Sequence, residues 1–81
     1  MLKYHVELIL NTLSRLDKEE IKNNFLEFAE DIKIVLIGQD DKKVSYDLKI
    51  SLFTDEPTII FDTCAQFGRI KSVKIDENRG G

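Results

Sequence analysis

Cys64 is the only cysteine among the 81 residues, and its thiol is the side chain best suited to nucleophilic chemistry. A reactive thiolate needs a lowered pKa, which a cationic neighbour or a helix N-terminus provides. Cys64 falls instead in the middle of an expected helix, on the apolar face that also carries Ile60 and Phe67. Because cysteines are among the most buried residues, we predict a packed core thiol. One cysteine cannot form an intramolecular disulfide, which fits a reducing compartment.

His5 is the only histidine, and alternation places it between Lys3 and Glu7 on the outer face of the first expected strand. We interpret it as a surface side chain, with a pH-responsive contact in an interface as the alternative. The usual zinc sites need three or four Cys, His or carboxylate ligands that converge on one point. Cys64 and His5 are expected on opposite sides of the sheet, so the sequence predicts no metal and no cofactor.

Adjacent carboxylates could suggest acid–base catalysis, and they occur at Glu19-Glu20, Glu30-Asp31, Asp40-Asp41 and Asp55-Glu56. Each pair lies at an expected helix end or turn, where capping, the helix dipole and turn preferences account for it. A phosphate-binding loop would need closely spaced glycines in G-x-G-x-x-G or Walker order. That spacing is absent from the glycines of the sequence, which are Gly38, Gly68, Gly80 and Gly81. We therefore predict that the protein is not an enzyme.

The charge of the chain argues against a nucleic-acid partner. Fifteen acidic and 12 basic residues give a net charge of -3, and the lysines are scattered rather than clustered. Domains that stack RNA bases on a sheet expose aromatic residues there. The outer face of the third expected strand shows polar side chains at Ser45, Asp47, Lys49 and Ser51.

The composition is typical of a soluble globular domain, with 42% hydrophobic and 33% charged residues. No run approaches the roughly 20 apolar residues of a membrane span. The N-terminal residues lead straight into a strand, without the pattern of a signal peptide. We therefore expect a cytoplasmic protein that has no membrane partner.

Alternating apolar residues predict four strands, over residues 2–10, 32–37, 44–53 and 70–75. Polar residues from Gly38 to Lys42 join the second strand to the third, so these two form a hairpin. A helix is expected from Pro57 to Phe67, because proline suits the first turn of a helix. Gly68 follows it and suits the left-handed position that ends many helices.

Another helix is expected between the first two strands. Asp17 and Glu20 have the spacing of a capping box, and Ser14 is a competing cap. We expect the helix to continue to about Glu30. Its inward stripe is predicted at Ile21, Phe25 and Phe28, widened by Leu26 and Ala29.

The element order is therefore βαββαβ, two split βαβ units, which is the ferredoxin-like plan. Right-handed crossovers would place both helices on one face of a four-stranded antiparallel sheet and leave the other face to solvent. In the usual strand order of this plan, 4-1-3-2, the first and third strands are central. We predict one ferredoxin-like α+β domain over residues 1–76 and a flexible tail over residues 77–81.

The polar outer face of this sheet is interrupted by four apolar side chains, Ile9, Val35, Ile37 and Phe53. Ile9 and Phe53 fall on neighbouring central strands, and the other two fall on the edge strand beside the third. Together they could form a contact with a partner or a second copy, or they could be ordinary surface, and both interpretations stay open. The edge that carries Val35 and Ile37 has little charge, so it is poorly protected against pairing with another chain.

The C-terminal Arg79-Gly80-Gly81 resembles the end of ubiquitin-like modifiers, in which a flexible diglycine enters an activating enzyme. The resemblance implies a carrier activated at Gly81. Ubiquitin-like folds begin with a hairpin, whereas this chain offers one strand before its first helix. A helix as long as the one expected over Pro57 to Phe67 also has no counterpart there. A solvated tail is the alternative interpretation.

A second resemblance covers about residues 2–76. The order of strand, helix, hairpin, strand and helix is similar to the response-regulator-docking domain of chemotaxis histidine kinases, which implies a small tethered module that does no chemistry. We predict a non-enzymatic interaction or adaptor domain, which docks a regulatory protein or homodimerises through its open sheet or an edge strand. The alternatives are a ubiquitin-like carrier and a small-molecule-sensing regulatory domain; the fold allows the latter but no residue identifies it.

Overall fold

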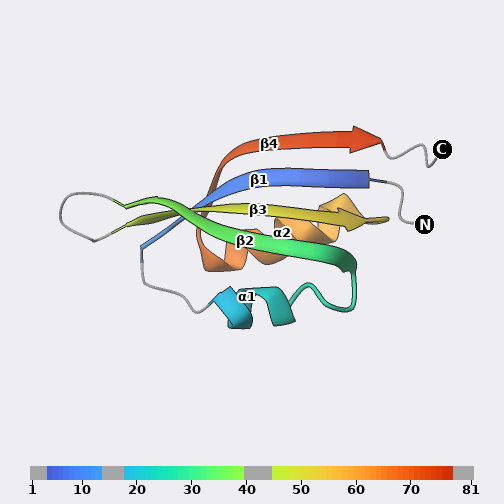
Figure 1. Ribbon diagram of the computed structural model, residues 1–81, viewed down its shortest axis with the longest axis horizontal. Coiled ribbons are helices and arrows are strands. Elements are labelled where there is room, and N and C mark those ends of the chain that lie inside the picture. The colour runs from blue at the N-terminus through green and yellow to red at the C-terminus, as the bar shows by residue number, and fades with distance from the viewer. Residues whose placement is uncertain (1–3, 14–17, 40–44, 78–81) are drawn as a thin grey trace.

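The computed structural model describes residues 4–13, 18–39 and 45–77. Within these ranges it forms an α+β fold with a four-stranded antiparallel sheet and two helices, as the sequence predicts (Figure 1). The elements are β1 (Tyr4–Thr12), α1 (Lys18–Asn23), β2 (Ala29–Gln39), β3 (Tyr46–Thr54), α2 (Pro57–Phe67) and β4 (Arg69–Glu77). The expected caps Ser14 and Asp17, the turn residues 40–42, Val44 and the glycines at 80 and 81 lie outside the described residues.

The strand order is β2-β3-β1-β4, so β1 and β3 are central and β2 and β4 are the edges, as predicted. Leu8 of β1 lies opposite Ile50 of β3 and Val73 of β4. Residues directly opposite one another in an antiparallel pair project from the same face. We call the face that carries Leu8 the inner face and the face that carries Glu7 the outer face.

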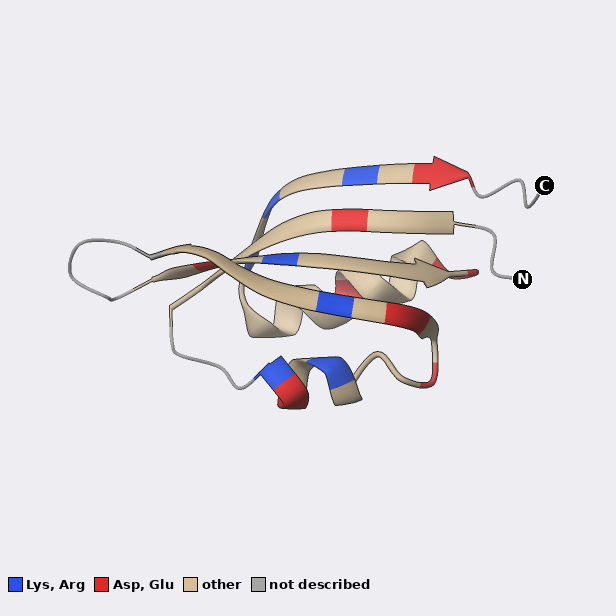
Figure 2. Ribbon diagram, in the orientation of Figure 1, with Lys and Arg blue, Asp and Glu red and all other residues tan. Residues whose placement is uncertain are grey.

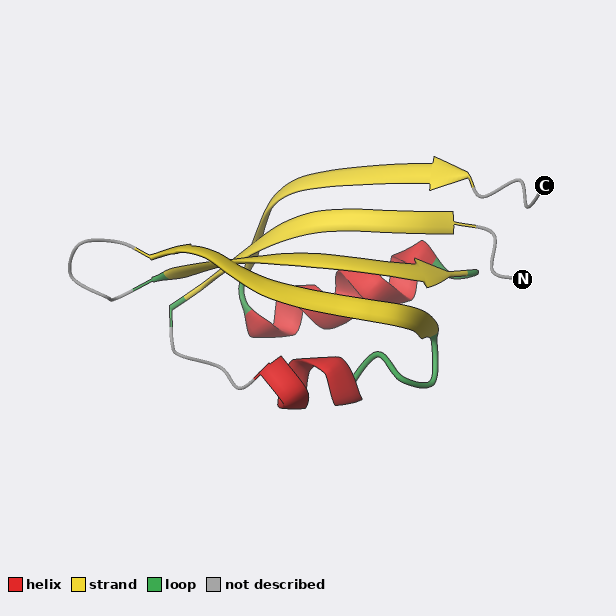
Figure 3. Ribbon diagram, viewed as in Figure 1, coloured by secondary structure: helices red, strands yellow, loops and turns green. Residues whose placement is uncertain are grey.

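The hydrophobic core lies between the inner face and the two helices. Every second residue of the central strands is buried there, namely Val6, Leu8, Leu10, Leu48, Ile50 and Leu52. α1 adds Ile21, the turn after it adds Phe25, and α2 adds Ile60 and Cys64 to the same buried cluster. Because α1 and α2 share one core with one face of the sheet, both helices cover the inner face, and no helix of the described residues lies on the outer face (Figure 3).

The first helix is much shorter than the sequence predicts, because it ends at Asn23 rather than near Glu30. From there the chain continues in tight turns, in which the N–H of Phe25 donates to the carbonyl of Lys22 at 2.9 Å. Asn24 helps to end the helix, since its side-chain amide donates to the carbonyl of Glu20 at 2.8 Å. No helix of the described residues is long and apolar enough to cross a membrane.

This early end corrects the predicted inward stripe of the helix. Ile21 and Phe25 are fully buried as expected. Leu26 and Phe28, by contrast, are 57% and 38% exposed, because the turns after Asn23 carry them away from the core. Ala29 is buried, but as the first residue of β2 rather than as part of a helix.

Gly68 ends α2 as predicted, but it is not left-handed. Its φ of 175° is extended backbone that any residue can adopt, and its N–H donates to the carbonyl of Cys64 at 3.1 Å. Glycine is required there for space, because a β-carbon at position 68 would overlap the carbonyl oxygen of Asn11 on β1.

The two edge strands differ in regularity. The pairing of β2 with β3 shifts register between Glu30 and Lys33 and again between Leu36 and Gly38, and Asp31 has a positive φ of 52°. β4 has one register shift against β1, near its start, and pairs regularly from Ser72 to its end. Bulges bend and twist a strand, so β2 offers a poorer template for a further strand than β4 does.

Candidate functional site

Cys64 and His5 lie on opposite sides of the sheet, as expected. Cys64 is fully buried, and this burial raises the pKa of its thiol to about 12. The Nε2 atom of His5 lies 2.9 Å from the hydroxyl oxygen of Ser51, and its ring centroid lies 4.8 Å from that of Phe53. No group of three or more His, Cys, Asp or Glu within residues 4–13, 18–39 and 45–77 could hold a metal ion.

Two ion pairs join strands on the outer face, where Figure 2 marks the charged positions along the ribbon: Lys49 with Glu7 links the neighbouring strands β3 and β1, and Lys71 with Asp47 links β4 to β3 across β1. Lys49 lies 3.0 Å from Glu7, and its hydrogen bond and charge hold the pKa of that carboxyl below its ordinary value. Asp47 accepts a hydrogen bond from Asn11 at 2.8 Å and pairs with Lys71 at 3.0 Å, and these two contacts lower its pKa. These charges therefore serve to hold the sheet together across its open face.

The structure does not bring the four apolar residues of the predicted contact together. Lys49 stands between Val35 and Ile9 in one row across the sheet, because it is opposite both of them. Phe53 lies in another row, opposite His5, about 13 Å away along β3 at the usual rise of a strand. Ile9 and Phe53 are half-buried, so Val35 and Ile37 are the two that are well exposed.

An apolar run on edge strand β2 extends these two residues. Val35, Leu36 and Ile37 are 52%, 44% and 48% exposed, and we call them the β2 apolar run. Leu36 lies on the inner face, opposite the buried Leu48, where the alternation of β2 would favour burial. It remains exposed because the short α1, whose only buried residue is Ile21, leaves this part of the inner face uncovered. The sequence carries no direct signal for that gap.

A second exposed apolar surface lies on β4. Val73 and Ile75 are on the inner face, opposite the buried Leu8 and Val6, yet each is 43% exposed. Ile70 is the residue of β4 that packs against the core. Strict alternation would place Ile70 on the face opposite to Val73 and Ile75, and the register shift between Ile70 and Ser72 brings all three to the inner face. No pattern within the strand reveals that α2 leaves the far part of β4 uncovered.

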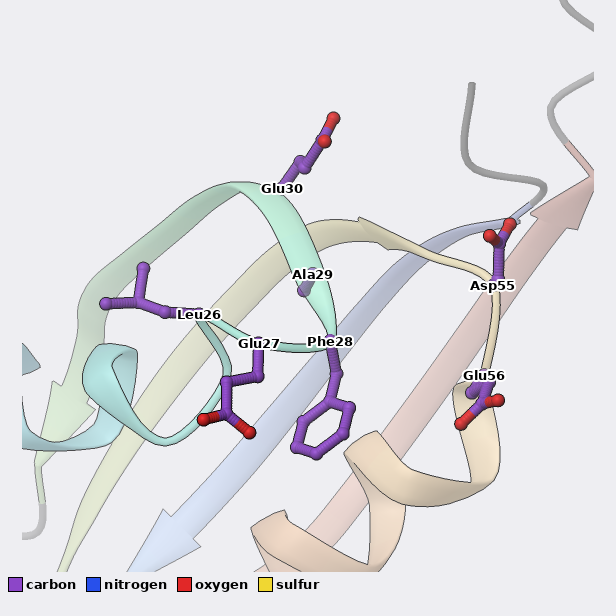
Figure 4. Close-up of a pocket in the computed structure, with 7 residues that line it drawn as sticks. All are labelled: Leu26, Glu27, Phe28, Ala29, Glu30, Asp55 and Glu56. Atoms are coloured by element: carbon purple, nitrogen blue, oxygen red, sulfur yellow. The ribbon is translucent and has the colours of Figure 1, made fainter.

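A hollow of about 370 Å³ lies where the turn after α1 meets the start of α2. It is lined by Leu26, Glu27, Phe28, Ala29, Glu30, Asp55 and Glu56 (Figure 4). Thr54 fixes its backbone, since its hydroxyl donates to the carbonyl of Phe28 at 2.6 Å and accepts from the N–H of Glu56 at 3.0 Å. Figure 4 shows Glu30 and Asp55 pointing to one side and Glu27 and Glu56 to the other. The carboxylates do not converge, so they cannot act on one ion or substrate atom.

Another hollow, of about 400 Å³, is lined by Asn11, Arg69, Ile70 and Lys71 at the other end of the sheet. Four of the seven residues that line the first hollow and three of the four that line the second are charged or polar, whereas ligand pockets are mainly apolar. The chain matches no protein-family model and no curated protein. The two exposed apolar surfaces on β2 and β4 are therefore the features on which a functional argument can rest.

Proposed function

We propose that this chain is a small non-enzymatic, cytoplasmic protein-interaction domain that docks another protein on its β2 apolar run. The observation that carries the proposal is three consecutive apolar side chains, Val35, Leu36 and Ile37, each close to half exposed at the edge of the sheet. Single exposed apolar residues are common, but a run on both faces of an edge strand is a feature of interaction surfaces. Of the apolar positions expected to bind a partner, Val35 and Ile37 belong to this run.

The bulges of β2 decide how a partner would bind. Regular pairing with β3 extends only from Lys33 to Leu36, so an added strand would find few aligned backbone groups. The partner therefore makes side-chain contacts, with an apolar segment laid over the β2 apolar run. Lys33 is exposed beside Val35, which favours a segment that carries a carboxylate next to its apolar residues.

The arrangement of elements supports a finer assignment of the fold and of the role. The order β1, α1, β2, β3, α2, β4 with β1 and β3 in the centre supports the ferredoxin-like plan. The same order and size support a module like the response-regulator-docking domain of chemotaxis kinases, in which a tethered domain holds a regulator and does no chemistry. In this proposal the β2 apolar run would receive that regulator.

No specific observation favours the other two candidate functions. A ubiquitin-like carrier depends on Gly80 and Gly81, which lie outside the described residues. A small-molecule sensor would need a mainly apolar pocket, and charged or polar residues are four of the seven that line one hollow and three of the four that line the other.

Affinity capture from the native lysate tests the proposal with three baits. They are the wild-type chain, the double variant Val35→Glu with Ile37→Glu, and a control with Thr58→Glu and Gln66→Glu at exposed positions of α2. Both variants add two negative charges, so they differ in where the charge is placed. We expect proteins that bind the wild type and the control but not the β2 variant. Identical protein sets on all three baits would contradict the proposal, provided that circular dichroism shows the β2 variant to be folded.

A further inference from the structure

The outer edge of β4 is long and regular, and no element within residues 4–13, 18–39 and 45–77 pairs with it. Every residue from Lys71 to Glu77 is exposed, and pairing with β1 is regular from Ser72 onward. Val73 and Ile75 add exposed apolar side chains on the inner face. A straight edge strand with unburied apolar residues is a ready site for pairing with another strand. We propose that β4 pairs antiparallel with β4 of a second copy of this chain, about a two-fold axis at Ile75.

The charges along β4 favour an axis at Ile75 over an axis at either adjacent residue. With the axis at Ile75, Lys74 of each copy lies opposite Asp76 of the other, which gives two reciprocal pairs of opposite charge on the outer face. With the axis at Lys74, two ammonium groups would face each other, and with the axis at Asp76, two carboxylates would. Like charges directly opposite one another destabilise a sheet, whereas opposite charges stabilise it. An axis at Val73 would set Ser72 opposite Lys74 and carry the pairing into the irregular start of β4.

The inner face of β4 agrees with this register. The axis brings Ile75 of one copy against Ile75 of the other, beside the exposed Val73 of each. The five residues from Val73 to Glu77 then pair without crossing the register shift near Ile70. Such a contact buries less than the roughly 1,200 Å² of a stable interface, so the dimer is expected to be weak and to depend on concentration.

The dimer determines how the two docking surfaces of the pair are arranged. Two copies joined at β4 form one eight-stranded sheet, with β2 of each copy at its two outer ends. This inference rests on the proposed function, because dimerisation would give the docking domain a second binding site for its partner. The strand that forms the dimer contact is β4, whereas the partner binds at β2. Two β2 apolar runs on one particle would raise the apparent affinity for a clustered partner.

Charge reversal on β4 tests the pairing with the full chain. The molar mass is measured by light scattering from about 10 µM to about 1 mM, the range in which a small interface associates. The variants are Lys74→Asp, Asp76→Lys and the two combined, with Lys18→Asp in α1 as the control. Each single variant sets like charges opposite one another and should raise the dissociation constant roughly tenfold or more. The combined variant restores both opposite-charge pairs and should dimerise like the wild type.

Mixing the two single variants gives a further positive result, because the acidic β4 of one then faces the basic β4 of the other. The equimolar mixture should reach the mass of two 9.4 kDa chains at concentrations where each variant alone has the mass of one. A wild-type chain that stays monomeric throughout the range would overturn the pairing. So would a dimer that is unaffected by either single variant, because it would form through another surface. Neither outcome bears on β2, since partner capture by the Val35→Glu, Ile37→Glu variant is scored separately.

Discussion

Gly68 lies directly against Asn11, so that a β-carbon on Gly68 would overlap the carbonyl oxygen of Asn11. The contact joins the end of α2 to the end of β1 at the point where the chain turns into β4. The obstacle is backbone, which cannot move aside as the end of a flexible side chain could. The position therefore fixes how closely α2 approaches the sheet.

Gly68→Ala is expected to destabilise the fold by about 2 kcal/mol or more, because overpacking of this kind forces the backbone apart. Urea unfolding followed by circular dichroism measures the loss. Gly38→Ala is the matched control, since a β-carbon there would lie at an ordinary distance of 3.9 Å from Asp47. Equal stability of the two variants would show that the Asn11 contact does not constrain the helix.

Phe25 and Leu26 are neighbours with opposite environments, and truncating each tests where α1 ends. Phe25→Ala removes a fully buried ring and should cost about 3 to 5 kcal/mol in the free energy of unfolding. Leu26→Ala removes a side chain that is 57% exposed and should change stability by about 0.5 kcal/mol or less. Thermal unfolding of the two variants gives the comparison. A large loss for Leu26→Ala would mean that this residue packs against the core, as a helix continuing to Glu30 would require.

The strands could be predicted because alternation follows directly from the pleat: a strand with one wet face must place Val6, Leu8 and Leu10 on the other. The end of α1 was missed because apolar spacing continues through Leu26 and Phe28, while the Asn24 side chain ends the helix locally. Gly68 was correctly predicted to end α2 from the local preferences of helix ends, but glycine is required there because of a tertiary contact with the backbone of Asn11.

The exposed apolar surfaces were the least predictable part of the candidate sites. Leu36, Val73 and Ile75 have the same alternation as core residues. Whether such a residue is buried depends on how far a helix extends over the edge of the sheet, and no pattern within one strand contains that information. The partner residues predicted from the outer face were therefore only part of the exposed apolar surface.

The ion pairs of the outer face predict that the protein loses stability in acid. The pKa of Glu7 and the pKa of Asp47 lie below their ordinary values of 4.5 and 3.8 in the folded protein. The unfolded chain binds protons first, so the stabilisation is present above these values and is lost as the pH falls through the folded pKa values. Urea midpoints, measured from neutral pH into the acid range, should decrease once the pH is below about 4.5.

Removing a cation should flatten this acid dependence. Lys49→Gln takes away the largest cause of the low pKa of Glu7, so the urea midpoint should change less between neutral and acid pH. Lys18→Gln, on α1, is the matched control and should show the same change in urea midpoint between neutral and acid pH as the wild type. Identical slopes for the wild type and both variants would mean that the Lys49–Glu7 pair does not stabilise the sheet.

Cys64 predicts a loss of stability in alkali. Its thiol has an ordinary pKa of 9.0 and a folded pKa of about 12, so the unfolded chain ionises first. Stability from this group is complete below pH 9.0 and declines as the pH rises toward 12. Cys64→Ala should remove this part of the decline, measured as the difference in urea midpoint between the two proteins at each pH. In the native wild type the thiol should also resist a thiol-specific reagent at neutral pH, and rapid labelling would contradict its burial.

Phe53→Asp tests whether a partner binds at the β2 apolar run alone or also contacts the central part of the outer face. Phe53 is half-buried against His5 and lies about 13 Å along β3 from Lys49, which faces Val35. The substitution should cost about 1 to 2 kcal/mol, since it removes an aromatic residue from a central strand. If partners bind at β2, affinity capture with this variant should still retain the proteins that the Val35→Glu, Ile37→Glu variant loses. Loss of those proteins from folded Phe53→Asp would instead mean that the binding surface extends across the open sheet from β2 to Phe53 on β3.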